Sequence, residues 1–445
     1  MKKIVVLMLM TTFMCAKAPL TLPDAISKVK QNNTEIIIAN FEKQISFLEH
    51  EATRHQHYGT VELSSSATRS NDALSVFGYK LQSRDATFAD FGFKQFNGSN
   101  YLLAPEDLNH PKDRNLFQTK IEYTLPLYTG VRLELYANIT KALHEMATLD
   151  HEALVQQKIF ELKKSFATLS LLKQYDITLK RIDANMAKLE AKAKALLEEG
   201  YIKKVDVLEV QSKRMDIERL IHMTTSQQIL LYHYLSFLVN ETVEDVEMSV
   251  DETIDVPTLL AKIQENNLEL KKAQRHVDIS KMQVGVAQSA FLPQVGAFVN
   301  YGSSDDVMWH DWAKNDAYTV GLSLKWNLFN GGSDQDRLEK ARVQSLKASQ
   351  EFIFAQKNIA LRVQQLLVGI SNDDFDIKRL LQEVVLAETI YAHYAGRYEQ
   401  RLVSIHDVLQ KQTEALMKTM KLHEAYNGRY EKQFELQKLA NKEAL

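Results

Sequence analysis

The 445-residue chain is poor in cysteine, glycine and proline. It has one cysteine, 15 glycines and 7 prolines, whereas average usage would give about 31 glycines and about 22 prolines. The single cysteine, Cys15, excludes a disulfide framework and a structural zinc site built on thiolates. So few turn-forming residues indicate that most of the chain lies in long helices.

The chain also lacks a positive charge excess and the common signatures of catalysis. It carries 54 basic and 57 acidic residues, a net charge of −3, which disfavours nucleic acid as a partner. It contains no nucleophile elbow, phosphate loop, zinc helix motif or dinucleotide fingerprint, so we expect neither an enzyme nor a cofactor. Four histidines, His55, His57, His110 and His310, lack ligand spacing on a clear scaffold, so we predict no metal site.

The start of the chain, 1–18, has the features of a secretory signal peptide. Lys2 and Lys3 precede an apolar run over 4–14, and Ala16 and Ala18 stand at a cleavage site. A buried N-terminal helix is disfavoured because Pro19 follows at once, and a lipoprotein reading of Cys15 lacks the usual small residues before it. Removal of 1–18 would change the net charge from −3 to −6. No later apolar run approaches the length that a membrane-spanning helix needs.

Residues 127–256 and 294–445 contain no proline. In the first tract, apolar residues recur with 3-4 spacing and one three-residue slip, which is typical of a coiled coil with a local adjustment. The predicted core positions are Ile159, Leu162, Phe166, Leu169, Leu172, Tyr175, Leu179, Ile182, Met186, Leu189, Ala193 and Leu196.

Three motifs of the first half recur in order in the second, which predicts two repeats. The segment 125–130 (LPLYTG) matches 326–331 (WNLFNG), and 206–211 (DVLEVQ) matches 407–412 (DVLQKQ), both at an offset of 201. The segments 32–36 and 266–270 match at an offset of 234. Because the offset is larger for the opening segments than for the later ones, we expect an insertion in the first half.

Alternating apolar and polar residues predict two strands in each half, near 60–69, 115–128, 294–302 and 317–329. Such strands suit lipid on one face and water on the other, although a half-buried soluble sheet has the same alternation. Four strands cannot close a barrel. If they enter a membrane, several chains must share one barrel, and the protein is then an obligate oligomer.

These features together resemble the TolC-like outer-membrane efflux proteins, over about residues 19–440. The resemblance is carried by the paired turns at 126–130 and 327–332 and by the paired tip segments at 200–208 and 401–409. The chain departs from the family at two places. Thr34 and its equivalent Leu268 stand where the family usually has proline, and Arg401 stands where it usually has glycine. The last departure leaves the conformation of the second tip open.

The resemblance implies a mainly helical protein with a β part. It implies a homotrimer whose twelve-stranded barrel lies in the cell outer membrane and continues as a helical tunnel into the periplasm. We expect a signal peptide at 1–18, a first efflux repeat at 19–250 and a second at 251–445. The implied function is that of a passive exit duct, with a periplasmic adaptor and an inner-membrane pump or secretion ATPase as partners. The alternative is an exported coiled-coil protein that spaces the cell envelope.

The resemblance places two candidate sites at the helical tips. The implied periplasmic gate comprises Asp206, Tyr398, Arg401, Asp407 and Gln410, in which carboxylates from three chains would favour cations. The alternative for the two aspartates is helix capping. The implied adaptor contacts are Gly200, Tyr201, Ile202, Leu402, Val403 and Ser404, whose alternative is packing within the chain.

The insertion, roughly 70–115, is rich in aromatic residues among polar ones, which excludes a solvated linker. We expect it to fold over the outer mouth of the duct as an extracellular loop. Its aromatic residues are Phe77, Tyr79, Phe88, Phe91, Phe93, Phe96 and Tyr101.

Overall fold

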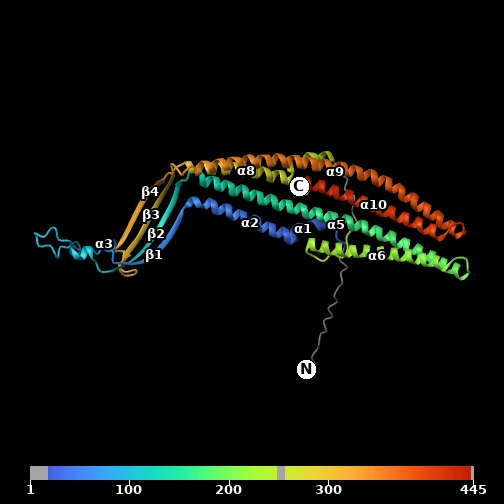
Figure 1. Cartoon of the computed structure of the whole chain (residues 1–445), viewed down its shortest axis with the longest axis horizontal. Coiled ribbons are helices and arrows are strands. Elements are labelled where there is room, and N and C mark those ends of the chain that lie inside the picture. The colour runs from blue at the N-terminus through green and yellow to red at the C-terminus, as the bar shows by residue number, and fades with distance from the viewer. Residues whose placement is uncertain (1–18, 248–255, 442–445) are drawn as a thin grey trace, which may run out of the picture. The chain divides into compact units, whose positions relative to one another are not determined.

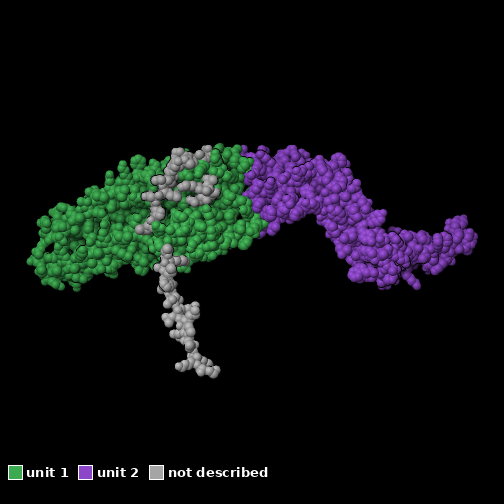
Figure 2. Space-filling model, turned by 180° about the vertical axis from the view of Figure 1, so that it is seen from behind, with its two compact units in different colours: residues 1–44, 146–274, 351–445 green, residues 45–145, 275–350 purple. Residues whose placement is uncertain are grey.

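The computed structural model describes residues 19–247 and 256–441 (Figure 1). The predicted signal peptide, 1–18, and the predicted repeat boundary at 250/251 lie outside these residues. The chain divides into two compact units, coloured separately in Figure 2. Unit 1 comprises 1–44, 146–274 and 351–445, and unit 2 comprises 45–145 and 275–350.

The fold is mainly helical with one small sheet, as the sequence predicts. Short 3₁₀ turns lie at Gln56–Tyr58, Phe88–Phe91 and Ser289–Phe291. The other elements are, in chain order, α1 (Leu22–Asn32), α2 (Thr34–His55), β1 (Thr60–Ser70), α3 (Ala73–Gln82), α4 (Glu106–Asn109), β2 (Arg114–Tyr128), α5 (Arg132–Glu198), α6 (Lys204–Val239), α7 (Val256–Asn266), α8 (Leu268–Gln288), β3 (Gln294–Asp305), β4 (Asp316–Lys325), α9 (Ser333–Glu399) and α10 (Ile405–Leu439).

The main elements of the first half recur in the second with nearly equal lengths. The helices α5 and α9 each have 67 residues, and α6 and α10 have 36 and 35. The opening helices also correspond, with 11 residues in α1 and α7 and with 22 and 21 in α2 and α8. The first half alone has α3 and α4, between its two strands.

Two buried asparagines hold the opening helices of the two halves in the same way. Asn33 Oδ1 accepts from the N–H of Glu35 at 3.1 Å and of Ile36 at 3.2 Å, and its amide donates to the carbonyl oxygen of Leu238 at 2.8 Å. Asn267 accepts from the N–H of Leu270 at 3.0 Å and donates to the carbonyl of Leu439 at 3.0 Å. Each asparagine therefore starts one helix and ties it to the end of another.

The core of unit 1 contains most of the coiled-coil positions predicted on α5. Nine of the twelve, from Ile159 to Ala193, are buried, and the other three are half-buried. Ion pairs join the long helices around this core, for example Lys164–Glu431 between α5 and α10 and Arg181–Glu388 between α5 and α9. Burial of each large apolar side chain stabilises the fold by about 1.5–3 kcal/mol.

Unit 2 contains the antiparallel sheet, in the order β1-β2-β3-β4. The register aligns apolar residues in rows: Leu63 pairs with Ile121, and Ile121 with Tyr301, which in turn pairs with Tyr318. The adjacent row on the other face is Glu62, Glu122, Asn300 and Thr319. One face is thus apolar and the other polar. The fourth strand ends at Lys325, so the expectation that it reaches 329 is wrong.

The insertion is not a plain loop, because it contains α3, a 3₁₀ turn at Phe88–Phe91 and the short α4. None of the described helices is both long and apolar enough to cross a membrane.

Candidate functional site

The two helical tips are the turns between α5 and α6 and between α9 and α10, and they share one backbone geometry. Gly200 has a φ of 76°, and Arg401, its equivalent in the second half, has a φ of 63°. Beyond them, the Tyr201 N–H donates to the Leu196 carbonyl at 2.9 Å, and the Leu402 N–H to the Arg397 carbonyl at 3.0 Å. Both helices therefore end with a left-handed residue and with a Schellman-type hydrogen bond between residues five positions apart. Arg401 adopts the conformation that the first tip gives to glycine.

The side chain of Arg401 joins the two tips. Its guanidinium carbon lies 3.9 Å from the ring centroid of Tyr201, which is a cation–π contact. Among the described residues, no hydrogen bond or ion pair joins Arg401 to Asp206 or Asp407. Arg401 therefore does not contact the two aspartates with which the implied gate groups it.

Both candidate gate aspartates cap the helices that follow the tips. Asp206 accepts from the N–H of Lys203 at 2.8 Å. Asp407 accepts from the N–H of Ser404 at 3.1 Å and from its hydroxyl at 2.6 Å, while the Ser404 hydroxyl accepts from the Asp407 N–H at 3.2 Å. The hydrogen bonds from Ser404 lower the pKa of Asp407. Both carboxylates are therefore placed by a capping interaction.

Tyr398 lies beneath the tip. It is only 5% exposed, and its hydroxyl has no hydrogen-bond partner among the described residues. Burial, with the nearby negative charge of Asp206, raises its pKa. Gln410 is exposed and donates to Glu414 at 3.1 Å, one turn along α10. The structure thus brings Tyr398 near Asp206 and directs Gln410 to its own helix.

The candidate adaptor residues divide into two groups. Ile202 and Val403 pack against the buried cluster of the tips, whose members include Val207, Tyr398 and Ile405. Tyr201 and Leu402 are 59% and 58% exposed, and Gly200 and Ser404 are also exposed. Packing within the chain therefore describes the first pair, and the others form an accessible surface.

Two residues of α6, Glu209 and Arg214, make polar contacts with neighbouring helices that the sequence does not predict. His406 Nδ1 lies 2.7 Å from a carboxylate oxygen of Glu209, which joins the starts of α10 and α6. Arg214 of α6 donates to Asp183 and Glu190 of α5 at 3.0 and 3.1 Å. Lys194, Gln211 and Arg214 lower the pKa of Glu190 to about 2. These contacts depend on how α6 packs against α5 and α10, which the sequence alone does not show.

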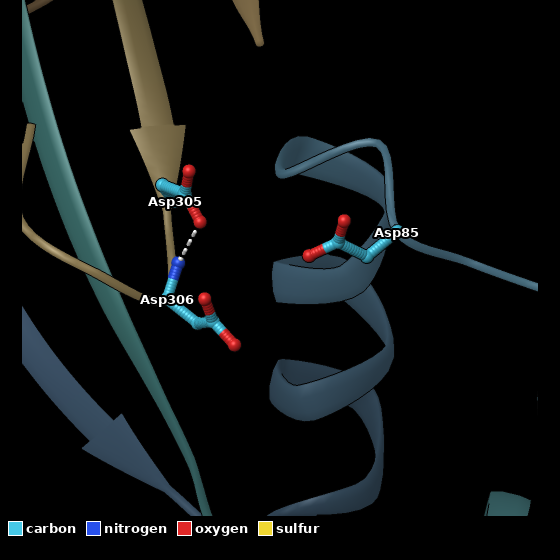
Figure 3. A group of neighbouring side chains, drawn as sticks. All are labelled: Asp85, Asp305 and Asp306. Atoms are coloured by element: carbon cyan, nitrogen blue, oxygen red, sulfur yellow. Dashed lines mark hydrogen bonds between the residues drawn. The ribbon is translucent and has the colours of Figure 1, made fainter. Parts of the chain in front are cut away.

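In unit 2, three carboxylates approach one another at the end of the sheet. Asp85 follows α3, and its side chain is directed toward Asp305 and Asp306 of the β3 end (Figure 3). Arg114 contacts both Asp85 and Asp306, and His310 lies 3.4 Å from Asp305. A protein cation, Arg114, therefore compensates part of this charge. His55, His57 and His110 do not belong to the carboxylate group that the described residues form.

Comparisons with known proteins agree with this architecture. The family described as outer membrane efflux protein matches residues 259–442. The outer membrane protein TolC of Vibrio cholerae serotype O1 is 25% identical over 160 residues, which are 34% of this chain. That match spans about a third, 35%, of the length of the relative.

Solved structures share the fold over nearly the whole chain. A crystal structure of CusC has a TM-score of 0.78 at 12% identity and covers 94% of this chain and 91% of its own. VceC from Vibrio cholerae has a TM-score of 0.77 at 15% identity, with coverages of 94% and 96%. The later part of the chain, 259–442, thus matches the outer membrane efflux protein family, and the likeness to these solved structures shows that the chain has their fold.

Proposed function

We propose that this protein is the outer-membrane exit duct of a tripartite efflux or type I secretion system. As a homotrimer, it conducts substrates passively from a periplasmic adaptor and an inner-membrane pump to the exterior. The energy comes from the pump, and no catalytic step is assigned to this chain.

The observation that carries the proposal is the sheet of unit 2, which has two unpaired edges and one apolar face. In the order β1-β2-β3-β4, both β1 and β4 lack a neighbour on one side within the described residues. Backbone groups without partners are costly in lipid, so these edges must be covered. Pairing β4 of one copy with β1 of the next covers them, and three copies give one closed sheet of twelve strands, with lipid on the apolar face.

Two exposed apolar stripes in unit 1 support the same assembly. On α6 and α9 the exposed residues recur every seven or eight positions, which is the spacing of a helix face that packs against another helix. Such a face is unfavourable in water unless a partner covers it. We assign the cover to the neighbouring copies. The stripe residues are Leu208, Met215, Met223, Leu230 and Phe237 on α6, and Phe354, Leu361, Val368 and Phe375 on α9.

The tips form the periplasmic end of the duct in this proposal. Tyr201 and Leu402 stand exposed there and meet the adaptor, together with Gly200 and Ser404. Ile202 and Val403 support them from the packed cluster.

Asp206 and Asp407 contribute six carboxylates to the constriction of a three-fold assembly. Like charges that gather near one axis attract cations, so the ring prefers cations and binds divalent ions. Tyr398 lies beside Asp206 and belongs to the same end of the duct.

The runner-up, an exported coiled-coil spacer, has no use for a sheet with one apolar face. Dye release from liposomes that contain the purified protein distinguishes the duct from the spacer. The proposal expects the extracted protein to have the mass of three chains and the liposomes to release a small trapped dye without an energy source. A folded monomer, or a trimer that leaves the liposomes as tight as protein-free ones, would contradict it.

A further inference from the structure

The insertion carries an exposed aromatic segment, residues 86–105. Its rings contact one another, with Phe88 and Phe93 centroids 5.6 Å apart, yet both rings remain exposed. Tyr101 and Leu102 are 80% and 86% exposed. So much apolar surface on one short segment indicates a contact that a single chain does not provide.

Polar contacts fix the base of this segment across the end of the sheet. The α3 helix begins three residues after β1 ends and contacts β2 and β3 (Figure 1). Past its end, Arg84 donates to the carbonyl oxygens of Lys314, at 3.0 Å, and Asp316, the first residue of β4. Arg114 holds Asp85 and, at 2.9 Å, the Ser83 hydroxyl. The insertion therefore runs from the β1 edge to the β4 edge before the aromatic segment begins.

The other end of the same insertion offers a matching surface. On α3, Leu74, Gly78 and Leu81 lie at spacings of four and three and so share one helix face. Leu74 is 81% exposed and Leu81 is also exposed. A Cβ placed on Gly78 would meet nothing within 4 Å, so this face has a recess between two leucines. Glycine is unfavourable inside a helix, and no neighbour among the described residues requires it here.

We propose that the aromatic segment of one copy docks on the Leu74–Gly78–Leu81 face of α3 in the neighbouring copy. The inference rests on the proposed trimer, in which β4 of one copy pairs with β1 of the next. That pairing brings the start of the segment, which Arg84 holds beside β4, to the start of the neighbour's α3, which follows β1. The recess at Gly78 receives an aromatic ring, and the three contacts form a ring around the outer mouth.

Cysteine cross-linking in the outer membrane tests this contact. Cys15 is the only natural cysteine and lies in the predicted signal peptide. The variant Leu74→Cys/Tyr101→Cys should give covalent dimers and trimers on a non-reducing gel after mild oxidation. Each single variant should remain monomeric on that gel. Adding Gly78→Leu, which fills the recess, should abolish the covalent bands.

A matched control uses Leu322→Cys/Tyr101→Cys, since Leu322 is exposed on the apolar face of β4. This pair should not cross-link. The mass of the extracted variants, measured without oxidation, reports the trimer separately. Trimers without cross-links would overturn the docking contact and leave the proposed duct intact, whereas monomers would overturn both. Covalent dimers from Tyr101→Cys alone would mean that the segments meet one another around the axis, and would also overturn the contact.

Discussion

The guanidinium of Arg401 stacks on the ring of Tyr201, with its central carbon 3.9 Å from the ring centroid. The contact links the two tips of one chain, although Arg401 holds a left-handed backbone conformation, with a φ of 63°, that favours glycine. This conformation costs a non-glycine residue about 1–2 kcal/mol, and an exposed cation–π contact offsets about 0.5–1 kcal/mol of that cost.

Two substitutions at Arg401 separate these contributions. Arg401→Ala removes the contact but keeps the strained backbone, so it should destabilise the tip by about 0.5–1 kcal/mol. Arg401→Gly removes both, so it should be neutral or stabilise the tip by up to about 1.5 kcal/mol. Hydrogen exchange of the amides around 398–404 measures the difference. Protection in Arg401→Ala equal to that of the parent would show that the stack contributes nothing.

Charge in the apolar stripes should break the assembly. Leu361→Glu and Phe375→Glu, combined, place two carboxylates in the face of α9 assigned to a neighbouring copy. Each lost apolar contact costs about 1.5–3 kcal/mol, and the buried charges add to this cost. Light scattering of the extracted protein should therefore show monomers. Gln356→Glu, an exposed change two positions after Phe354 and so on another face of the same helix, should remain trimeric. A trimer in the stripe variant would show that the face is not an interface.

The capping and gate roles of the two aspartates can be separated by asparagine. Asp206→Asn/Asp407→Asn keeps a capping oxygen and removes the charge. The gate role predicts unchanged thermal stability, weaker block by divalent and trivalent cations from the periplasmic side, and higher resting conductance. Asp206→Ala/Asp407→Ala should add a loss of stability of about 1 kcal/mol for each capping-box hydrogen bond removed. If the asparagine variant conducts and blocks like the parent, capping is the only role of these residues.

The contacts of Glu190 with α6 should make the link between α5 and α6 sensitive to acid. Its contacts with Lys194, Gln211 and Arg214 lower its pKa from 4.5 to about 2. The stabilisation is therefore complete above pH 4.5 and is lost as the pH falls toward 2, with a size on the order of 3 kcal/mol. The melting temperatures of the parent and Glu190→Gln should differ at pH 6 and converge near pH 2. A constant difference across this range would rule out the linkage.

The polar face of the sheet should contribute to ion preference. Glu62 and Glu122 are direct register partners on neighbouring strands, an unfavourable pairing of like charges that Lys120, 3.0 Å from Glu122, partly offsets. In a trimer, six such carboxylates line one level of the duct. Glu62→Gln/Glu122→Gln should shift the reversal potential in a salt gradient toward zero. Glu49→Gln, a change on α2 away from the sheet, serves as the control and should leave the potential unchanged.

The parts of the fold with strong periodicity could be predicted from sequence. The apolar spacing from Ile159 to Ala193 identified the α5 core, and alternation located all four strands to within a few residues. The end of β4 was misplaced because the alternation continues past Lys325 to Leu328, although the strand pairing stops. The α3 and α4 helices were missed because each is short and lies between turn residues.

The tips were found through their repeated motif, but their contacts were not. The equivalence of Gly200 and Arg401 follows from the constant offset between the two halves, whereas the stack on Tyr201 depends on how two distant turns meet. Sequence also could not distinguish Ile202 and Val403, which pack inward, from Tyr201 and Leu402, which stay exposed. These outcomes are set by the tertiary packing of four helix ends.

The most direct test of the duct is single-channel recording of the purified trimer in a planar lipid bilayer. The account predicts discrete, cation-preferring conductance steps that need no energy source. It also predicts that trivalent cations added on the periplasmic side reduce these steps in the parent more than in Asp206→Asn/Asp407→Asn. A purified, folded trimer that inserts into the bilayer and gives no conductance, in either the parent or this variant, would contradict the account.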